Sequence, residues 1–149
     1  MTRPAVLEED EMTQQNLRGM ALWASVYDNL EEKLREKLKQ AHPDLPFHII
    51  GSHYAALLSD PEAGGRQGQV ARTGKVLTEV MAVASLRALD GAGPQMLSHV
   101  YGLQRAWEDR TWKEGWVGDE VVAKWLTDDE GCEWVLGQVD EIVKVFKSK

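Results

Sequence analysis

The sequence contains a single cysteine, Cys132, among its 149 residues. One cysteine cannot form a disulfide within the chain, and it cannot supply both sulfurs of a thiol–disulfide redox pair. A disulfide-stapled secreted scaffold is therefore excluded, and an intracellular location is expected.

The sequence also lacks a long hydrophobic run. No apolar stretch reaches the roughly 20 residues that a membrane-spanning helix needs. The first residues, MTRPAVLEEDEMTQQ, have neither the apolar centre of a signal peptide nor the basic, acid-poor composition of a transit peptide. We therefore expect a cytoplasmic protein with no membrane partner.

Basic residues are scarce. The chain has 17 Lys and Arg against 24 Asp and Glu, which gives a formal net charge of −7. Nucleic acids and anionic membranes bind clustered Lys and Arg, so neither is expected as a partner. The apolar fraction of 43% is that of an ordinary globular protein, and the length suits one domain over residues 1–149.

Six tryptophans stand out for a chain of this length. Tryptophan brings a large apolar area and one polar N–H group. Packing against neighbouring helices or a second subunit is one interpretation of the cluster, and stacking of one or two rings against a ligand is the other.

The apolar spacing predicts helices along the whole chain, with no strand alternation. Residues 17–40 have apolar residues three and four apart, which predicts one long amphipathic helix that ends at His42-Pro43. Residues 47–59 would suit a strand or a helix, and their Ala and Leu content favours the helix. The Gly-rich segment 60–75 is predicted to be a mobile loop.

The second half of the chain predicts a buried helical hairpin. Residues 76–89 are apolar around most of the helix, Gly91 and Gly93 break it, and Pro94 suits the first turn of the next helix. Two more helices are expected after it, and the last is predicted to bury Val135, Val139, Ile142 and Phe146. The fold class is all-α.

Glu79 and His99 are the main catalytic candidates. Glu79 falls on an apolar face of the first hairpin helix, and His99 lies near the start of the second. Burial raises the pKa of a carboxyl group, as a general acid or base requires, and a helix start favours a neutral imidazole. Either residue could equally be a structural group that is bonded inside the core.

Five further residues are candidates for substrate binding. Gln95 and Ser98 flank His99, although Gln95 could simply cap its own helix. His53 and Tyr54 could supply a second acid or base, or could simply be packed, and Trp107 could line an aromatic pocket.

Other familiar sites are absent from the sequence. GQVARTGKV (residues 68–76) has five residues between its glycines and Val76 in place of Ser or Thr, so it is not a phosphate loop. His42, His48 and His53 are six and five residues apart, which does not place them on one helical face. No metal site is predicted.

Leu77-Thr78-Glu79 opens an Ala-rich helix, and DGAGPQMLSH (residues 90–99) leads into the next helix. Over residues 76–107 this pattern resembles the core hairpin of the carboxymuconolactone decarboxylase and alkylhydroperoxidase D-like family. The resemblance implies a helical bundle with a central buried hairpin, and a homo-oligomer, trimeric or hexameric, assembled through such hairpins.

Peroxidase members of that family carry Cys-x-x-Cys-x-x-x-His at the helix junction and a Glu in the preceding helix. Here Ala92 and Gln95 stand at the cysteine positions, His99 keeps the histidine position, and Glu79 falls within one residue of the glutamate. Peroxide reduction needs one sulfur to attack and one to resolve, so it is excluded. The resemblance leaves the decarboxylase-like branch, whose members need no cofactor.

The leading hypothesis is a cofactor-independent lyase or isomerase that transfers protons on a small organic acid or enolisable metabolite. His99 would be the acid or base, and Glu79 would orient it or relay its proton. The competing hypothesis is a non-catalytic ligand-binding or oligomeric assembly protein that has lost the redox cysteines. In that case Glu79 and His99 are satisfied core residues.

Overall fold

The computed structural model describes residues 9–61 and 72–147. Within these ranges it contains helices and no strand, so the prediction of an all-α fold is confirmed. The chain divides into two compact units, Met1–Val70 and Ala71–Lys149, here named unit 1 and unit 2. The expectation of a single domain stays a prediction. No helix of the described residues is both long and apolar enough to cross a membrane.

Unit 1 begins with two helices that the sequence analysis predicted as one. Helix α1 (Glu9–Tyr27) leads through a short 3-10 helix, η1 (Asp28–Leu30), into α2 (Glu31–Ala41). The single helix predicted over residues 17–40 is therefore wrong at Asp28. This residue has a φ of 47°, and Asp tolerates such a left-handed conformation better than most residues. The predicted end before His42-Pro43 is confirmed.

The rest of unit 1 is a short α-helix, α3 (Leu45–His48), that continues as a π-helix, η2 (Ile49–Leu58). The helical prediction for this segment is confirmed, but its π type was not predicted. A π-helix joins residues five apart, as in the 2.9 Å bond from the Ser59 N–H to the Tyr54 carbonyl. This spacing determines which side chains become neighbours.

Helices α1 and η2 pack closely because α1 has a glycine at the contact. A Cβ atom on Gly19 would lie 2.5 Å from the Cα of Ala55. Near this contact Trp23 and Tyr27 of α1 pack with Tyr54 of η2 in an aromatic cluster. The Trp23 ring lies 4.3 Å from the Tyr27 ring and 5.0 Å from the Tyr54 ring, between centroids.

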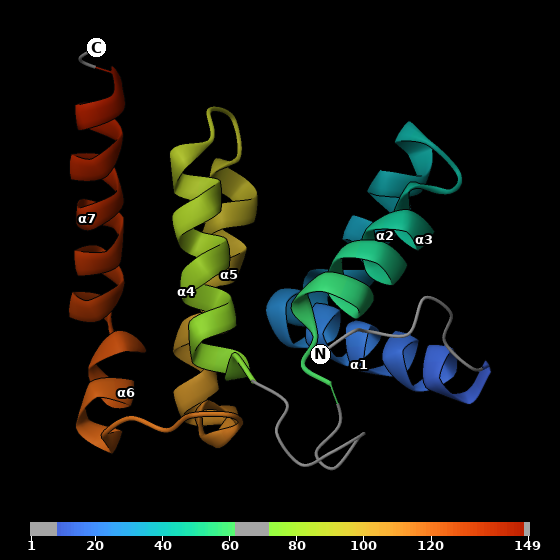
Figure 1. Cartoon of the computed structure of the whole chain (residues 1–149). Helices are drawn as coiled ribbons and strands as arrows, with labels where there is room; N and C mark the ends of the chain where they lie inside the picture. The colour runs from blue at the N-terminus through green and yellow to red at the C-terminus, as the bar shows by residue number, and fades with distance from the viewer. Residues whose placement is uncertain (1–8, 62–71, 148–149) are drawn as a thin grey trace. The chain divides into compact units, whose positions relative to one another are not determined.

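Unit 2 is built around the predicted hairpin, which is confirmed. Helix α4 (Gly74–Ala88) runs beside α5 (Gly93–Glu108) and also packs against α7 (Asp129–Lys147) (Figure 1). A 3-10 helix, η3 (Thr111–Lys113), and a short helix, α6 (Glu120–Leu126), connect α5 to α7. Helix α4 therefore provides one face to each of its two neighbours.

The first turn of α4 is fixed by two glycines. Gly74 and Gly115 have φ values of 73° and 70°, and a Cβ on Gly74 would overlap the carbonyl oxygen of Glu114. Only glycine fits this close approach between Gly74 and the backbone of Glu114 and Gly115 without strain. Residues 62–71 of the predicted mobile loop lie outside the described residues. The prediction is wrong at its end, because Gly74 and Lys75 belong to α4.

Helix α7 packs inward along only part of its length. Val135 and Val139 are buried as predicted, whereas Ile142 and Phe146 are 57% and 73% exposed. The prediction of an inward stripe is therefore wrong for its second half. In the last turns of α7, Val143 and Lys147 line a pocket with Leu86 and Asp90, so Ile142 and Phe146 lie off the side of α7 that faces the end of α4.

Candidate functional site

Three ionisable side chains are buried together between α4 and α5. Glu79 is fully buried, and Lys75 and His99 are 7% and 5% exposed. Lys75 and Glu79 are four residues apart, which places them on one face of α4, and His99 faces them from α5. We name Lys75, Glu79 and His99 the buried ionic trio.

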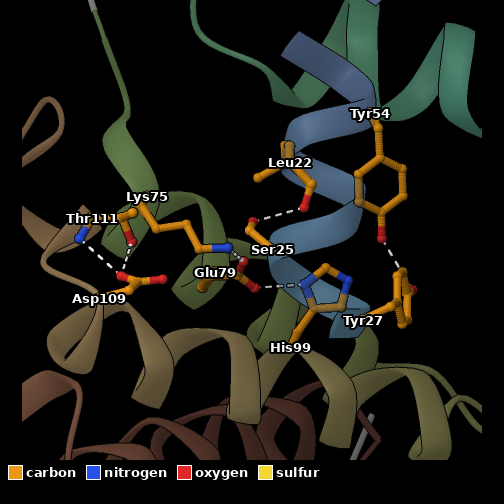
Figure 2. Close-up of polar contacts among 9 residues, drawn as sticks. All are labelled: Leu22, Ser25, Tyr27, Tyr54, Lys75, Glu79, His99, Asp109 and Thr111. Carbon is orange, nitrogen blue, oxygen red and sulfur yellow. Dashed lines mark hydrogen bonds and ion pairs between the residues drawn. The ribbon is translucent and has the colours of Figure 1, made fainter. Parts of the chain in front are cut away.

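The Glu79 carboxylate bonds both of the other members. Its Oε1 lies 2.5 Å from the Lys75 Nζ, and its Oε2 lies 2.7 Å from the His99 Nδ1. Figure 2 shows Lys75 and His99 approaching the carboxylate from different sides. Charge-assisted hydrogen bonds of this kind are short and strong, and they fix the position of the imidazole ring.

A glycine on α5 makes room for the carboxylate. A Cβ atom on Gly102 would lie 3.1 Å from the Glu79 Oε1 and 3.2 Å from its Oε2. An alanine there would require the carboxylate or α5 to shift by a few tenths of an ångström. The absence of a side chain at Gly102 therefore allows α5 to approach α4 at the trio.

The hydrogen bond to Glu79 assigns the roles of the two ring nitrogens of His99. A carboxylate accepts hydrogen bonds, so the Nδ1 of His99 donates to it. In a neutral imidazole the other nitrogen, Nε2, is then the proton acceptor. A histidine held in this way can act as a general base at Nε2 and return the proton as a general acid.

Gln95 and Ser98 do not join the trio in the structure. The Ser98 hydroxyl donates to the Pro94 carbonyl of its own helix at 3.1 Å, and Gln95 is exposed. Their proposed contact with a substrate stays a prediction.

Trp107 packs on another tryptophan. Its ring stacks on Trp112 with the centroids 5.2 Å apart and the planes 18° apart, and the Lys124 Nζ lies 5.8 Å from the Trp107 centroid. This arrangement fits the packing interpretation of the tryptophan cluster. A ligand-stacking role for Trp107 stays a prediction.

His53 and Tyr54 belong to unit 1. The Tyr54 hydroxyl is buried and donates to the Tyr27 hydroxyl at 3.0 Å, whereas His53 is exposed beside His48. The packed interpretation therefore fits Tyr54. It does not fit His53, which the π-helix holds at the surface.

The turn between α4 and α5 borders a pocket of about 360 Å³. Gly91 and Met96 line this pocket together with charged side chains, whereas none of the trio does. The turn and the trio are thus separate features of unit 2.

Cys132 is not a candidate nucleophile. Burial, together with the charges of Asp129 and Asp128, raises the pKa of its thiol to about 11. The thiolate is the reactive form, so this side chain is inert at neutral pH.

Lys75 is the member of the trio that the sequence analysis missed. In the sequence it stands out only as part of a stretch that fails the phosphate-loop pattern. The signal that could have found it is its spacing of four residues from Glu79, because this spacing pairs opposite charges on a helix.

Comparison with known proteins found no significant similarity to this chain. No protein-family model matches the chain, and no curated protein or solved structure is significantly similar to it. The geometry of the described residues therefore has to support a functional proposal alongside the sequence resemblance.

Proposed function

We propose that this protein is a cofactor-independent lyase or isomerase that transfers protons on a small organic acid or enolisable metabolite. The observation that supports the proposal is the 2.7 Å bond between the His99 Nδ1 and the fully buried Glu79 carboxylate. Such a bond orients an imidazole for proton transfer at its other nitrogen. The family resemblance over residues 76–107 supports the same class of reaction.

Each member of the trio has a distinct role in this proposal. His99 is the catalytic residue, and its Nε2 takes a proton from a carbon next to a carbonyl group or returns one to it. In a decarboxylation, the carbon–carbon bond breaks, CO₂ leaves, and the electron pair stays as an enolate that accepts the proton from His99. Glu79 is a positioning residue for the ring, and Lys75 balances the charge of the carboxylate.

The resemblance extends the proposal to assembly and location. We propose a cytoplasmic homo-oligomer, trimeric or hexameric, whose partner is a small-molecule substrate. The net charge of −7 supports the expectation that neither nucleic acid nor a membrane is a partner.

Solvent hydrogen exchange tests the proposal over a whole class of compounds at once. The protein is incubated in D₂O with a panel of small oxo acids and unsaturated lactones, and deuterium incorporation and CO₂ release are followed by NMR. We expect His99→Gln to reduce the rate for an active compound by about 10²–10⁴-fold, the usual contribution of general acid–base catalysis. The matched control is His42→Gln, an exposed histidine of unit 1.

Glu79→Gln should lower the rate less than His99→Gln, because the amide keeps the shape of the carboxylate but not its charge. The pH profile of the remaining activity should also change, which a purely structural role would not produce. If folded His99→Gln retains the wild-type rate with every active compound, the proposal is wrong.

A second candidate function is a non-catalytic ligand-binding or assembly protein. The specific observation in its favour is that Lys75 and His99 both bond Glu79 inside the core, as satisfied structural groups do. This function predicts that trio variants lose thermal stability without losing ligand binding or changing a rate. The exchange assay and a melting curve on the same variants distinguish the two functions.

A further inference from the structure

The π-helix of unit 1 brings two histidines together at the surface. His48 is the last residue of α3, and His53 lies five residues further on, within η2. Their ring centroids are 5.2 Å apart and their planes are at 82°, and both side chains are exposed. In an α-helix, residues five apart lie on different faces. In a π-helix, residues five apart become neighbours.

The separation of the two rings suits a shared metal ion. An ion about 2.1 Å from one nitrogen of each imidazole, at a tetrahedral angle of about 109°, places the two ring centroids roughly 5 Å apart. The observed centroid separation of 5.2 Å is compatible with a shared ion once the rings turn so that one nitrogen of each faces it. Neutral imidazole is a preferred ligand of zinc, copper and nickel.

Ser52 provides a hydrogen-bond partner for one ring nitrogen of His48. Its Oγ lies 3.4 Å from the His48 Nδ1. A histidine that binds a metal commonly donates its second ring N–H to a neighbouring oxygen, which fixes the orientation of the ring. When the Nδ1–H of His48 donates to the Ser52 Oγ, the Nε2 of His48 is the nitrogen left for the ion.

We propose that His48 and His53 form a surface site for a divalent transition-metal ion, with Zn²⁺ and Cu²⁺ as the best fits. In the described parts of the chain, no three His, Cys, Asp or Glu side chains gather closely enough to hold a metal. The protein thus supplies two ligands, and water completes the coordination. Such a site binds and exchanges its ion readily, and it leaves open positions that an anionic ligand can occupy. This proposal replaces the prediction of no metal site.

Calorimetric titration of the whole chain with ZnCl₂, and separately with CuCl₂, tests the site. The wild type should bind one equivalent of ion in the micromolar range. His48→Gln and His53→Gln should each weaken metal binding by more than about tenfold. At other metal sites, loss of a residue that only hydrogen-bonds a metal ligand already costs about that much affinity. His42→Gln is the matched control, because this histidine is exposed in the same unit, and it should bind as the wild type does.

Ser52→Ala provides a graded test, and it should weaken binding while leaving the stoichiometry at one. Electron paramagnetic resonance of the Cu²⁺-loaded protein should show two nitrogen ligands in the wild type and one in each histidine variant. Circular dichroism checks that the variants fold. We expect them to fold, because both histidine side chains are exposed.

Three results would overturn the proposal. The first is that the wild-type protein binds neither ion. The second is that the His48 and His53 variants bind as tightly as the wild type. The third is that the His42 variant loses as much affinity as the His48 and His53 variants. None of these results bears on the buried ionic trio, which lies in unit 2.

Discussion

The two units bury polar groups in opposite ways. In unit 1 the buried hydroxyls of Tyr27 and Tyr54 bond each other inside an aromatic cluster, and both groups are neutral. In unit 2 a carboxylate is buried against an ammonium group and an imidazole. A neutral hydroxyl pair costs little to bury, whereas a buried charge is tolerated only while all of its partners are present. The candidate chemistry lies in the unit that maintains the more costly arrangement.

The largest expected effect tests that contrast at the trio. Glu79→Leu leaves the Lys75 ammonium buried without the carboxylate, so unit 2 should lose about 3–5 kcal/mol of its free energy of unfolding. Hydrogen exchange followed by mass spectrometry, which reports each unit separately, measures the loss.

The paired control is Lys75→Met combined with Glu79→Leu. It should recover part of this stability, because an apolar pair of similar volume replaces the ion pair while the Nδ1–H of His99 still lacks its Glu79 acceptor. Equal losses in the single and double variants would show that the charge of Lys75 is not the cause.

A smaller effect is expected at the helix contact of unit 1. Gly19→Ala places a Cβ atom 2.5 Å from the Cα of Ala55 and forces α1 and η2 apart. We expect a loss of about 1–3 kcal/mol, the usual cost of overpacking, with hydrogen exchange that rises in unit 1 only.

Gly137→Ala is the matched control for that substitution. Gly137 lies within α7, and nothing is within 4 Å of its added Cβ. The change should stabilise the helix by up to about 1 kcal/mol, the difference in helix propensity. Destabilisation by both substitutions would indicate that steric contact is not the reason.

The hydroxyl pair of unit 1 should matter less. Tyr54→Phe removes the donor of the 3.0 Å bond to Tyr27 and keeps the ring in the cluster. We expect a cost of about 0.5–1.5 kcal/mol in urea denaturation. Tyr101→Phe, at a tyrosine that is 52% exposed, should have no measurable effect. A cost for Tyr54→Phe as large as that for Glu79→Leu would contradict the contrast between the units.

The smallest effect is expected at an exposed ion pair of unit 2. Arg87 of α4 donates two hydrogen bonds to Asp140 of α7, at 2.8 and 2.7 Å. These bonds lower the pKa of Asp140 below its ordinary value of 3.8. The pair therefore stabilises unit 2 at neutral pH, and this contribution is lost as the pH falls through the lowered pKa of Asp140.

NMR titration of the Asp140 carboxyl carbon measures this effect. Arg87→Gln should return the pKa of Asp140 towards its ordinary value, and added salt should shrink the stability difference, because exposed pairs are screened. Lys144→Gln is the control and should shift the pKa of Asp140 less, since this charge acts only through its field.

Much of the fold could be predicted because it depends on local patterns. The helix boundary at His42-Pro43 and the hairpin before Pro94 follow from backbone geometry that these residues impose wherever they occur. The break at Asp28 could not be predicted, because the apolar spacing continues through it and a left-handed φ at one Asp does not alter that spacing. The exposure of Ile142 and Phe146 could not be predicted either, because periodicity shows which residues share a helical face but not which neighbouring helix covers that face.

The candidate site was predictable in part for the same reason. Glu79 and His99 stood out as polar residues on apolar helical faces, and the structure places them 2.7 Å apart. Lys75 was missed because it lies at the border of a Gly-rich polar segment, where the start of α4 depends on the crossing of Gly74 and Gly115.

The sequence by itself determined the helical class, the hairpin and the residue types available for chemistry, since these follow from periodicity, from turn residues and from composition. Only the tertiary structure decided which residues meet. It joined Lys75 to Glu79 and His99 because α4 begins at Gly74, and it joined His48 to His53 because the helix there has π-type bonding. Contacts of this kind depend on where a helix starts and how it is wound, and neither property is set by the residues at the contact alone.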